Sequence, residues 1–205
     1  MGFLESLQQG VKTDEEIISG KPPVDKELEA LKGLEVGSCL HEDWRQTRKN
    51  EDGTYEPRWK KVKDPNFKFI ESDTCRKNEE GVVEIDIANR SFGELSADWQ
   101  FENLEAGKVV SRLVGDKTEL TPEEVEQMAS EIHDEWLKRN DWVFDPNYGN
   151  PAQAVPYAEL SEEEKEKDRA QLKFGLSLNQ RLLSGEVKKQ DLKEKFKSTE
   201  TPVVE

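Results

Sequence analysis

The sequence is poor in the residues that most often build metal sites and disulfide frameworks. Its 205 residues include two cysteines, Cys39 and Cys75, and two histidines, His41 and His133. The cysteines form no CxxC pair, which favours a reduced, cytoplasmic compartment over a disulfide scaffold. The histidines have no cysteine partners and are too few for a zinc site. We therefore expect no metal and no other cofactor.

Apolar residues are scarce as well, at 33% of the chain, whereas charged residues reach 37%. Globular proteins average about 45–50% and about 25%. This composition argues against one large apolar core and favours small helical units with polar edges. Five tryptophans and eight phenylalanines exclude wholesale disorder. No apolar run approaches the roughly 18 residues that span a bilayer, and no signal-peptide core follows Met1. We expect no membrane association, and a cytoplasmic location (the host cytoplasm if the chain is viral).

Motifs of common enzymes are missing too. The sequence contains no glycine-rich phosphate loop, no dinucleotide fingerprint and no nucleophile elbow, so we expect a protein that is not an enzyme. A net charge of −15 repels phosphate polymers and argues against DNA or RNA as a partner. Between residues 45 and 63, however, basic residues outnumber acidic ones. This local excess could hold a small anion, or it could offset an acidic neighbour.

Capping residues and apolar periodicity predict several helices. The clearest begins at Thr121, with Pro122 at the first helical position and Glu124 completing a capping box. Ser161 and Glu164 predict a second capping box, which opens a helix to about residue 183. A helix over 97–113 has Ser96 as its N-cap. The remaining expected helices cover residues 25–32, ended by Gly33, and residues 38–48.

The other segments are less regular. Residues 50–69 contain a D-G turn and two prolines, which predict a loop or ribbon. Residues 81–87 alternate well enough for a short strand, although an extended loop fits equally. Residues 1–24 read as an N-terminal arm with short helical fragments, and residues 186–205 as a polar tail with one short helix.

Two parts of the chain resemble each other. "SFGELSADW" from Ser91 and "PYAELSEEE" from Pro156 each contain an aromatic residue, Glu-Leu, and a serine N-cap before a helix. Upstream of both lies an HxxW pattern, at His41 and at His133. Repeats define the structural unit of a fold. We therefore expect a mainly α fold with two pseudo-symmetric helix–loop–helix repeats, irregular or short β segments in the loops, and one joint core. The divisions are a divergent repeat with an inserted loop (25–116) and a clearer repeat (117–185), between the arm (1–24) and the tail (186–205).

The second copy resembles a known family. "IHDEWLKRN", a later Trp and "VPYAELSEEEKEKDR" are similar to the ryanodine receptor repeat, or RyR domain. The resemblance covers residues 121–183 well and residues 35–114 only as a divergent copy. Its motif positions fall on His133, Trp136, Pro156, Tyr157, Glu164, Lys165, Asp168 and Arg169. In the first copy, Ser91-Phe92 replaces Pro-Tyr and Leu104 replaces the arginine.

The resemblance implies binding rather than catalysis. RyR repeats occur in tandem in calcium-release channels, where the pair is associated with adenine nucleotides. They also occur in bacterial and phage proteins suspected of sensing nucleotide signals. By position, Trp44 and Trp136 would be the faces between which a base stacks, a contact worth about 1–3 kcal/mol. Basic side chains would meet the phosphates. The expected ligand site comprises His41, Trp44, Arg45, Arg48, Arg58, Trp59, Lys60, His133, Trp136, Arg139 and Tyr157.

Two interpretations of these residues stay open. A tryptophan on an apolar helix stripe is usually core, and the histidines are expected to bond a backbone carbonyl or an acid. Trp59 could cap the pocket or pin the inserted loop, and Tyr157 and Phe92 could simply staple loop to helix. The functional alternatives follow. The chain binds a nucleotide or nucleotide-derived signal, for sensing or sequestration, or it is a structural or assembly protein. In the assembly case the arm and the tail dock onto partners, and the arm could also form a homo-oligomer.

Overall fold

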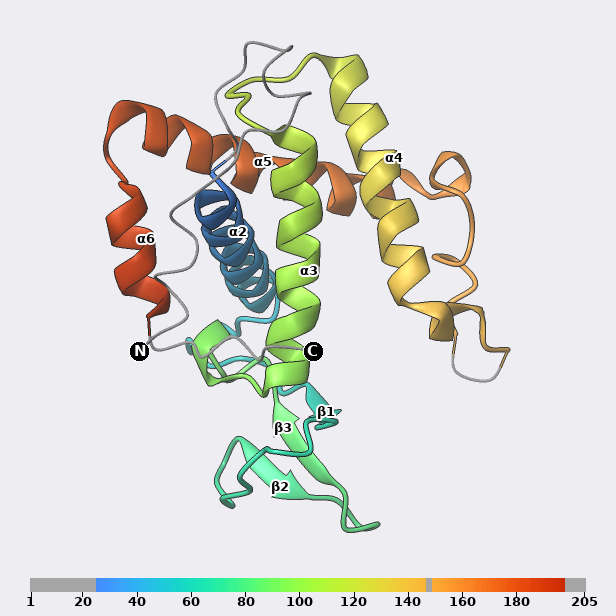
Figure 1. Cartoon of the computed structure of the whole chain (residues 1–205). Coiled ribbons are helices and arrows are strands. Elements are labelled where there is room, and N and C mark those ends of the chain that lie inside the picture. Colours follow the sequence, from blue (N-terminus) through green and yellow to red (C-terminus); the bar gives the residue numbers. More distant parts are fainter. Residues whose placement is uncertain (1–24, 147–148, 198–205) are drawn as a thin grey trace.

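The structure, a computed structural model, describes residues 25–146 and 149–197. The N-terminal arm, and the oligomer contact predicted for it, lie outside the described residues. In chain order the main elements are α2 (Lys26–Gln46), β1 (Trp59–Lys61), β2 (Cys75–Lys77), β3 (Val83–Asp86), α3 (Ala97–Val114), α4 (Pro122–Arg139), α5 (Glu162–Ser184) and α6 (Lys189–Phe196). Short 3-10 turns η2 (Phe92–Glu94), η3 (Asp141–Phe144) and η4 (Tyr157–Glu159) connect them. The predicted mainly α fold with short β segments is confirmed (Figure 1).

Helix α2 is one continuous element, so the prediction of two helices separated at Gly33 was wrong. Asp25 caps its N-terminus through a 3.0 Å bond from the Leu28 amide to Oδ1. Gly33 and Gly37 lie inside the helix, on the face that meets α3. Opposite them, a Cβ added to Gly107 would lie 2.1 Å from the Gly33 carbonyl oxygen and 2.5 Å from the Gly37 nitrogen. These glycines therefore allow two helix backbones to touch, a role that overrides the usual helix-ending signal of glycine.

The inserted loop contains a small antiparallel sheet with strand order β1-β3-β2. The strand expected over residues 81–87 is confirmed as β3, and Ile85 pairs with Lys60 on one side and Cys75 on the other. The buried carboxylate of Asp86 fixes the sheet to the following loop. It accepts hydrogen bonds from the amides of Arg58 and Ala88 and from the side chain of Asn89.

The caps of α4 and α5 differ from each other. At α4 the predicted capping box is complete, because Thr121 and Glu124 exchange side-chain-to-backbone hydrogen bonds. At α5 the Ser161 hydroxyl accepts from the Glu164 amide at 3.3 Å. The Glu164 carboxylate, however, accepts from Gln153 and Lys167. The second capping box is therefore only half formed. Ser96 precedes α3 as predicted, but its buried hydroxyl has no hydrogen-bond partner.

A large hydrophobic cluster joins both halves of the chain, and a smaller one, of Ala129, Tyr157 and Leu160, lies within the second repeat. The large cluster contains Val36 of α2, Val110 of α3, Ile132 of α4, Leu172 of α5 and Phe196 of α6. In Figure 1, α3 lies between α2 and α4, and α5 passes behind them at the top of the view. None of the helices in the described ranges is long and apolar enough to cross a membrane.

The short helix expected in the C-terminal tail is present as α6, and it packs on α2. Leu192 and Phe196 are buried in the core. Lys189 pairs with Asp25 at 2.7 Å, and Lys195 pairs with the buried Glu35 at 2.6 Å. This part of the tail is bound to the chain's own core, so it is not a free docking arm.

Candidate functional site

The two HxxW patterns have the same local geometry. His41 and Trp44 lie one turn apart on α2, with ring centroids 5.9 Å apart and planes at 30°. His133 and Trp136 on α4 are 6.0 Å apart, with planes at 22°. In each helix the histidine is buried and the tryptophan is half-buried.

Each histidine is fixed by the loop of its own repeat. His41 Nε2 lies 2.9 Å from the Arg90 carbonyl oxygen, and His133 Nε2 lies 2.8 Å from the Val155 carbonyl oxygen. A carbonyl oxygen can only accept, so both Nε2 atoms carry hydrogen. The expectation that the histidines bond backbone carbonyls is confirmed. Through these bonds each histidine orients the loop of its own repeat.

The segments after these carbonyls also match. Phe92 and Tyr157 are buried at the start of the 3-10 turns η2 and η4. Leu95 and Leu160 are both 6% exposed and follow those turns. The sequence similarity between the repeats therefore corresponds to a similar local structure: a histidine on one helix anchors the loop that opens the next.

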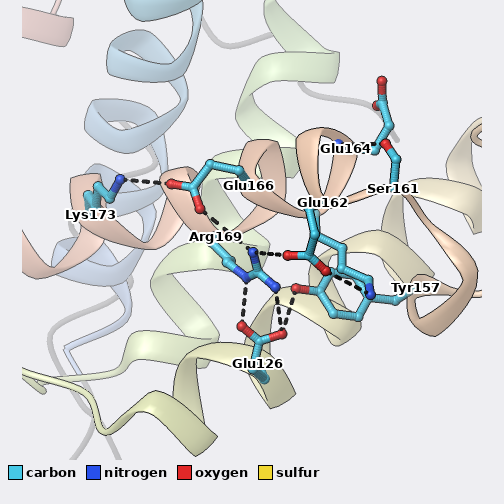
Figure 2. A network of polar contacts seen from close by, with 9 residues as sticks. Glu126, Tyr157, Ser161, Glu162, Glu164, Glu166, Arg169 and Lys173 are labelled. Atoms are coloured by element: carbon cyan, nitrogen blue, oxygen red, sulfur yellow. Dashed lines mark hydrogen bonds and ion pairs between the residues drawn. The ribbon is translucent and has the colours of Figure 1, made fainter.

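The two repeats differ at the position of Arg169. Figure 2 shows Arg169 of α5 bound by Glu126 of α4 through Nε at 2.6 Å and Nη2 at 3.1 Å. Its Nη1 reaches Glu162 at 3.0 Å, and the Tyr157 hydroxyl donates to Glu126 at 3.1 Å. In the first repeat the apolar Leu104 occupies the position of this arginine. The network fastens α4 to α5.

Tyr157 belongs to this network rather than to an open site. Burial and its hydrogen bond to Glu126 raise the pKa of Tyr157 to about 12. Lys165 Nζ lies 5.7 Å from the centre of its ring. With its hydroxyl bound and its ring buried, Tyr157 supports the loop and offers little to a ligand.

Asp168 makes a second contact that the first repeat lacks. Its Oδ2 lies 3.5 Å from His133 Nδ1, and both side chains are nearly buried. Burial, with a smaller contribution from the charge of Glu164, raises the pKa of Asp168 to about 7. The matching residue in the first repeat is Asn103, whose side chain donates to the Trp99 carbonyl. Burial lowers the pKa of His41.

Trp44 is covered by its own neighbours. The Arg48 guanidinium lies 5.7 Å from the centre of the Trp44 ring and also pairs with Glu56 at 2.9 Å. Arg45 donates to the Ala88 carbonyl and to Glu42. Arg45 and Arg48, two of the arginines expected to meet phosphates, therefore already have protein partners.

Trp59 and its basic neighbours belong to the sheet. The Arg76 guanidinium lies 3.9 Å from the centre of the Trp59 ring. Lys60 Nζ lies 5.5 Å from the Trp99 ring centre, and burial lowers the pKa of Lys60. Arg58 is exposed. Trp59 thus pins the inserted loop, which was one of its two expected roles.

Trp136 has a partner that sequence reasoning missed. Trp142, on η3, meets it edge-on with ring centroids 6.3 Å apart and planes at 81°. Asn140 holds the pair, because it donates to the Trp136 carbonyl and accepts from the Trp142 indole at 2.9 Å. Trp142 is 49% exposed and Phe144 is 57% exposed. The signal was the sequence "WLKRNDWVF", in which both rings flank a helix end.

Arg139 adds a cation to this region. It occupies the last turn of α4, three residues after Trp136, and its Nε is buried without a hydrogen-bond partner. A buried unpaired donor is costly, so it is a position where an acceptor would be stabilised. We call Trp136, Arg139, Trp142 and Phe144 the aromatic surface.

The predicted site residues therefore form three groups, not one pocket. One group lies at the end of α2, one on β1, and one around the end of α4. No ring contact joins Trp44 to Trp136 in residues 25–146 and 149–197, and α3 lies between their helices. An open hollow of about 540 Å³ lies on the sheet and contains none of the predicted residues. Its lining mixes cations and acids, including the pairs Lys61–Glu80 and Arg76–Glu84.

Within the described ranges, no group of three or more His, Cys, Asp or Glu side chains is placed to hold a metal ion. No family model, curated protein or solved structure matches the chain.

Proposed function

We propose that the protein binds a nucleotide or nucleotide-derived signal without catalysing a reaction, and that the base stacks on the aromatic surface of the second repeat. The observation that carries this proposal is the exposed Trp142 ring, held edge-on to Trp136 one turn from Arg139 in the sequence of α4. Ordered, exposed aromatic faces next to a cation suit a flat, anionic ligand.

The chemistry of the surface favours this class of ligand. His133 stacks on Trp136, and Asn140 fixes the Trp142 indole, so both rings are ordered before a ligand arrives. Preorganised aromatic side chains lose little entropy on binding. Arg139, a partly exposed cation in the last turn of α4, would attract the phosphate group of such a ligand. The resemblance of residues 121–183 to RyR repeats points to the same class.

The proposal changes the location of the ligand relative to the sequence-based expectation. Trp44 carries Arg48 over its ring, whereas Trp142 is half exposed. The first repeat then supports the core, and the second repeat binds. Adenine-containing ligands remain the first to test, and the binding would serve sensing or sequestration.

The test is a titration with adenine nucleotides and cyclic dinucleotides, followed by tryptophan fluorescence and melting temperature. We expect at least one of these ligands to quench fluorescence and raise the melting temperature. Trp142→Ala should abolish both effects and, because Trp142 is exposed, keep the fold. Trp59→Ala is the matched control, since it removes a tryptophan that a cation already covers. If no ligand in the panel changes either signal, the proposal is wrong.

The same surface also gives an observation in favour of the assembly alternative. Trp142 and Phe144 are both about half exposed, and exposed aromatics mark protein interfaces as well. Light scattering separates the two functions. A large regular oligomer without added ligand, dispersed by Trp142→Ala, supports assembly, and a monomer that binds nucleotide supports the proposed function.

A further inference from the structure

The position of Val155 makes His133 the anchor of the segment that carries Trp142. We call residues 140–146 and 149–156 the crossing segment. Backbone hydrogen bonds tie its two parts together, from Asn150 to the Val143 carbonyl at 3.1 Å and from Gly149 to the Asp145 carbonyl at 2.7 Å. At its far end, the Val155 carbonyl accepts from His133 at 2.8 Å. These backbone hydrogen bonds therefore link the position of Val155, which His133 holds, to the position of the aromatic surface.

The His133 imidazole faces two acceptors, the Val155 carbonyl and the Asp168 carboxyl group. His133 Nε2 carries hydrogen because it faces a carbonyl oxygen. Its Nδ1 lies 3.5 Å from Asp168 Oδ2, so a favourable contact there requires one more proton, on either the imidazole or the carboxyl group. When that proton leaves to solvent, one hydrogen on the imidazole remains for two acceptors. The ionised carboxylate of Asp168 is a stronger acceptor than the Val155 carbonyl, so the hydrogen moves to Nδ1 and the Val155 contact is lost.

We propose that His133 and Asp168 form a proton-dependent latch, which holds the crossing segment on α4 when the pair is protonated and releases it when the pair loses its proton. The first repeat has the same histidine–carbonyl contact but Asn103 in place of the acid. An amide does not titrate in this range, so the first repeat keeps its loop at all physiological pH values.

The surroundings of Asp168 raise the pKa of its carboxyl group toward neutrality. Both side chains are nearly buried, which disfavours the carboxylate, and burial raises the pKa of Asp168 to about 7. Two charged groups of α5 face the pair, Glu164, which favours protonation, and Lys167, which opposes it. From η4 the Tyr157 ring lies 6.4 Å from the His133 ring, with its hydroxyl bound to Glu126 of α4. Asp134, the next residue on α4, is exposed.

The latch would regulate the proposed ligand site, and only this consequence rests on the proposed function. Loss of one hydrogen bond from the crossing segment weakens the ordering of Trp142. We expect the dissociation constant of a stacking nucleotide to rise about fivefold between pH 6 and pH 8, the effect of one net hydrogen bond. In Asp168→Asn the dissociation constant should stay constant over this range.

The latch itself is tested on the ligand-free protein by NMR of the imidazole nitrogens. The chain has two histidines, so His41 is an internal control in the same sample, and His41→Gln assigns the signals. We expect the His133 nitrogen signals and the amides of residues 140–146 and 149–156 to shift together as Asp168 ionises, with a midpoint near pH 7. Asp168→Asn should remove both changes, while its far-UV circular dichroism confirms the fold.

Three results would overturn the latch. The first is that the His133 nitrogen signals do not change between pH 5 and pH 9. The second is that they change with pH in Asp168→Asn as they do in the wild type. The third is a titration that the crossing-segment amides do not follow. The NMR titration does not involve a ligand. Amides that follow the titration in a protein that binds no nucleotide therefore support the latch and refute the proposed function alone.

Discussion

At the scale of single residues, glycine sets the distance between the first two long helices. Gly37 and Gly107 face each other across the α2–α3 contact, where the backbones themselves touch. A methyl group at Gly107 would overlap the Gly33 carbonyl oxygen at 2.1 Å, and backbone atoms cannot rotate away as a flexible side chain can. The helices would have to separate and lose contacts along their length.

We predict that Gly107→Ala lowers the free energy of unfolding by about 2–3 kcal/mol. Overpacking typically costs about 1–3 kcal/mol, and a strict backbone clash lies at the upper end. The better helix propensity of alanine, worth about 1 kcal/mol, offsets part of it. Urea unfolding measures the change. Gly93→Ala is the control, because no atom lies within 4 Å of the added methyl group. Equal stability of the two variants would contradict the close approach.

A second residue-scale prediction concerns pH. In the folded protein Asp168 has a pKa of about 7, against an ordinary value of 3.8, so the fold binds this proton more tightly than the unfolded chain does. Its contribution to stability is therefore complete below about pH 4 and is lost as the pH rises through about 7. Asp168→Asn has no such loss.

The stability of the wild type minus that of Asp168→Asn should consequently fall by a few kcal/mol between pH 4 and pH 8, since each pKa unit is worth about 1.4 kcal/mol. Urea unfolding at several pH values gives this difference. Taking the difference removes the acid-range effects of other carboxyl groups, such as Glu126, whose pKa is lowered by its bond to Arg169. A difference that is flat with pH would show that Asp168 is an ordinary carboxylate.

At the scale of elements, local rules predict helix starts better than helix ends. Thr121 and Glu124 lie within four residues of each other, so this cap forms from local contacts. Gly33 carries a signal that is ambiguous, since glycine both ends helices and permits close packing. The contact with Gly107 on α3 decides between these two roles, and the sequence around Gly33 gives no sign of that contact.

The last helix shows the same limitation. Its sequence, "KQDLKEKF", is mostly charged and predicts a solvated tail, but Leu192 and Phe196 fall on one face and fill the core against α2. The charges that suggested a free arm pair with acids of α2, such as Lys195 with Glu35. Charge composition therefore indicated exposure, whereas the spacing of two apolar residues decided the packing.

We predict that Phe196→Ala lowers the free energy of unfolding by about 3 kcal/mol, within the range for truncating a buried phenylalanine. Gln190→Ala, an exposed position on the same helix, should change it by less than about 0.5 kcal/mol. Urea unfolding compares the two. If both variants are as stable as the wild type, α6 does not contribute to the core.

At the scale of the whole molecule, both repeats contribute to the larger hydrophobic cluster. Gly175 of α5 packs against Val110 and Val114 of α3, so the second helix pair is completed by the first. We predict a single cooperative urea transition for the full chain. A fragment of residues 117–185 should be unfolded, because it lacks α2, α3 and α6. A cooperative melt of that fragment by circular dichroism would contradict the shared core.

The repeat itself was predictable because histidine, the aromatic residue and the serine cap recur in the same order. The position of the candidate site was not. Trp44 and Trp136 match in sequence, but matching positions in two repeats need not face each other, and here α3 intervenes. Trp142 follows α4 through a 3-10 turn, whose direction brings it back to Trp136. That direction depends on tertiary contacts and is absent from a helical pattern.

The most direct test of the central claim observes the indole N–H signals of all five tryptophans by NMR while nucleotides are added. Binding at the aromatic surface predicts that the signals of Trp142 and Trp136 shift together and saturate. Those of Trp59 and Trp99, on or beside the sheet, should stay in place. Shifts centred on Trp44 or Trp59, or no shift with any adenine nucleotide or cyclic dinucleotide, would contradict the account.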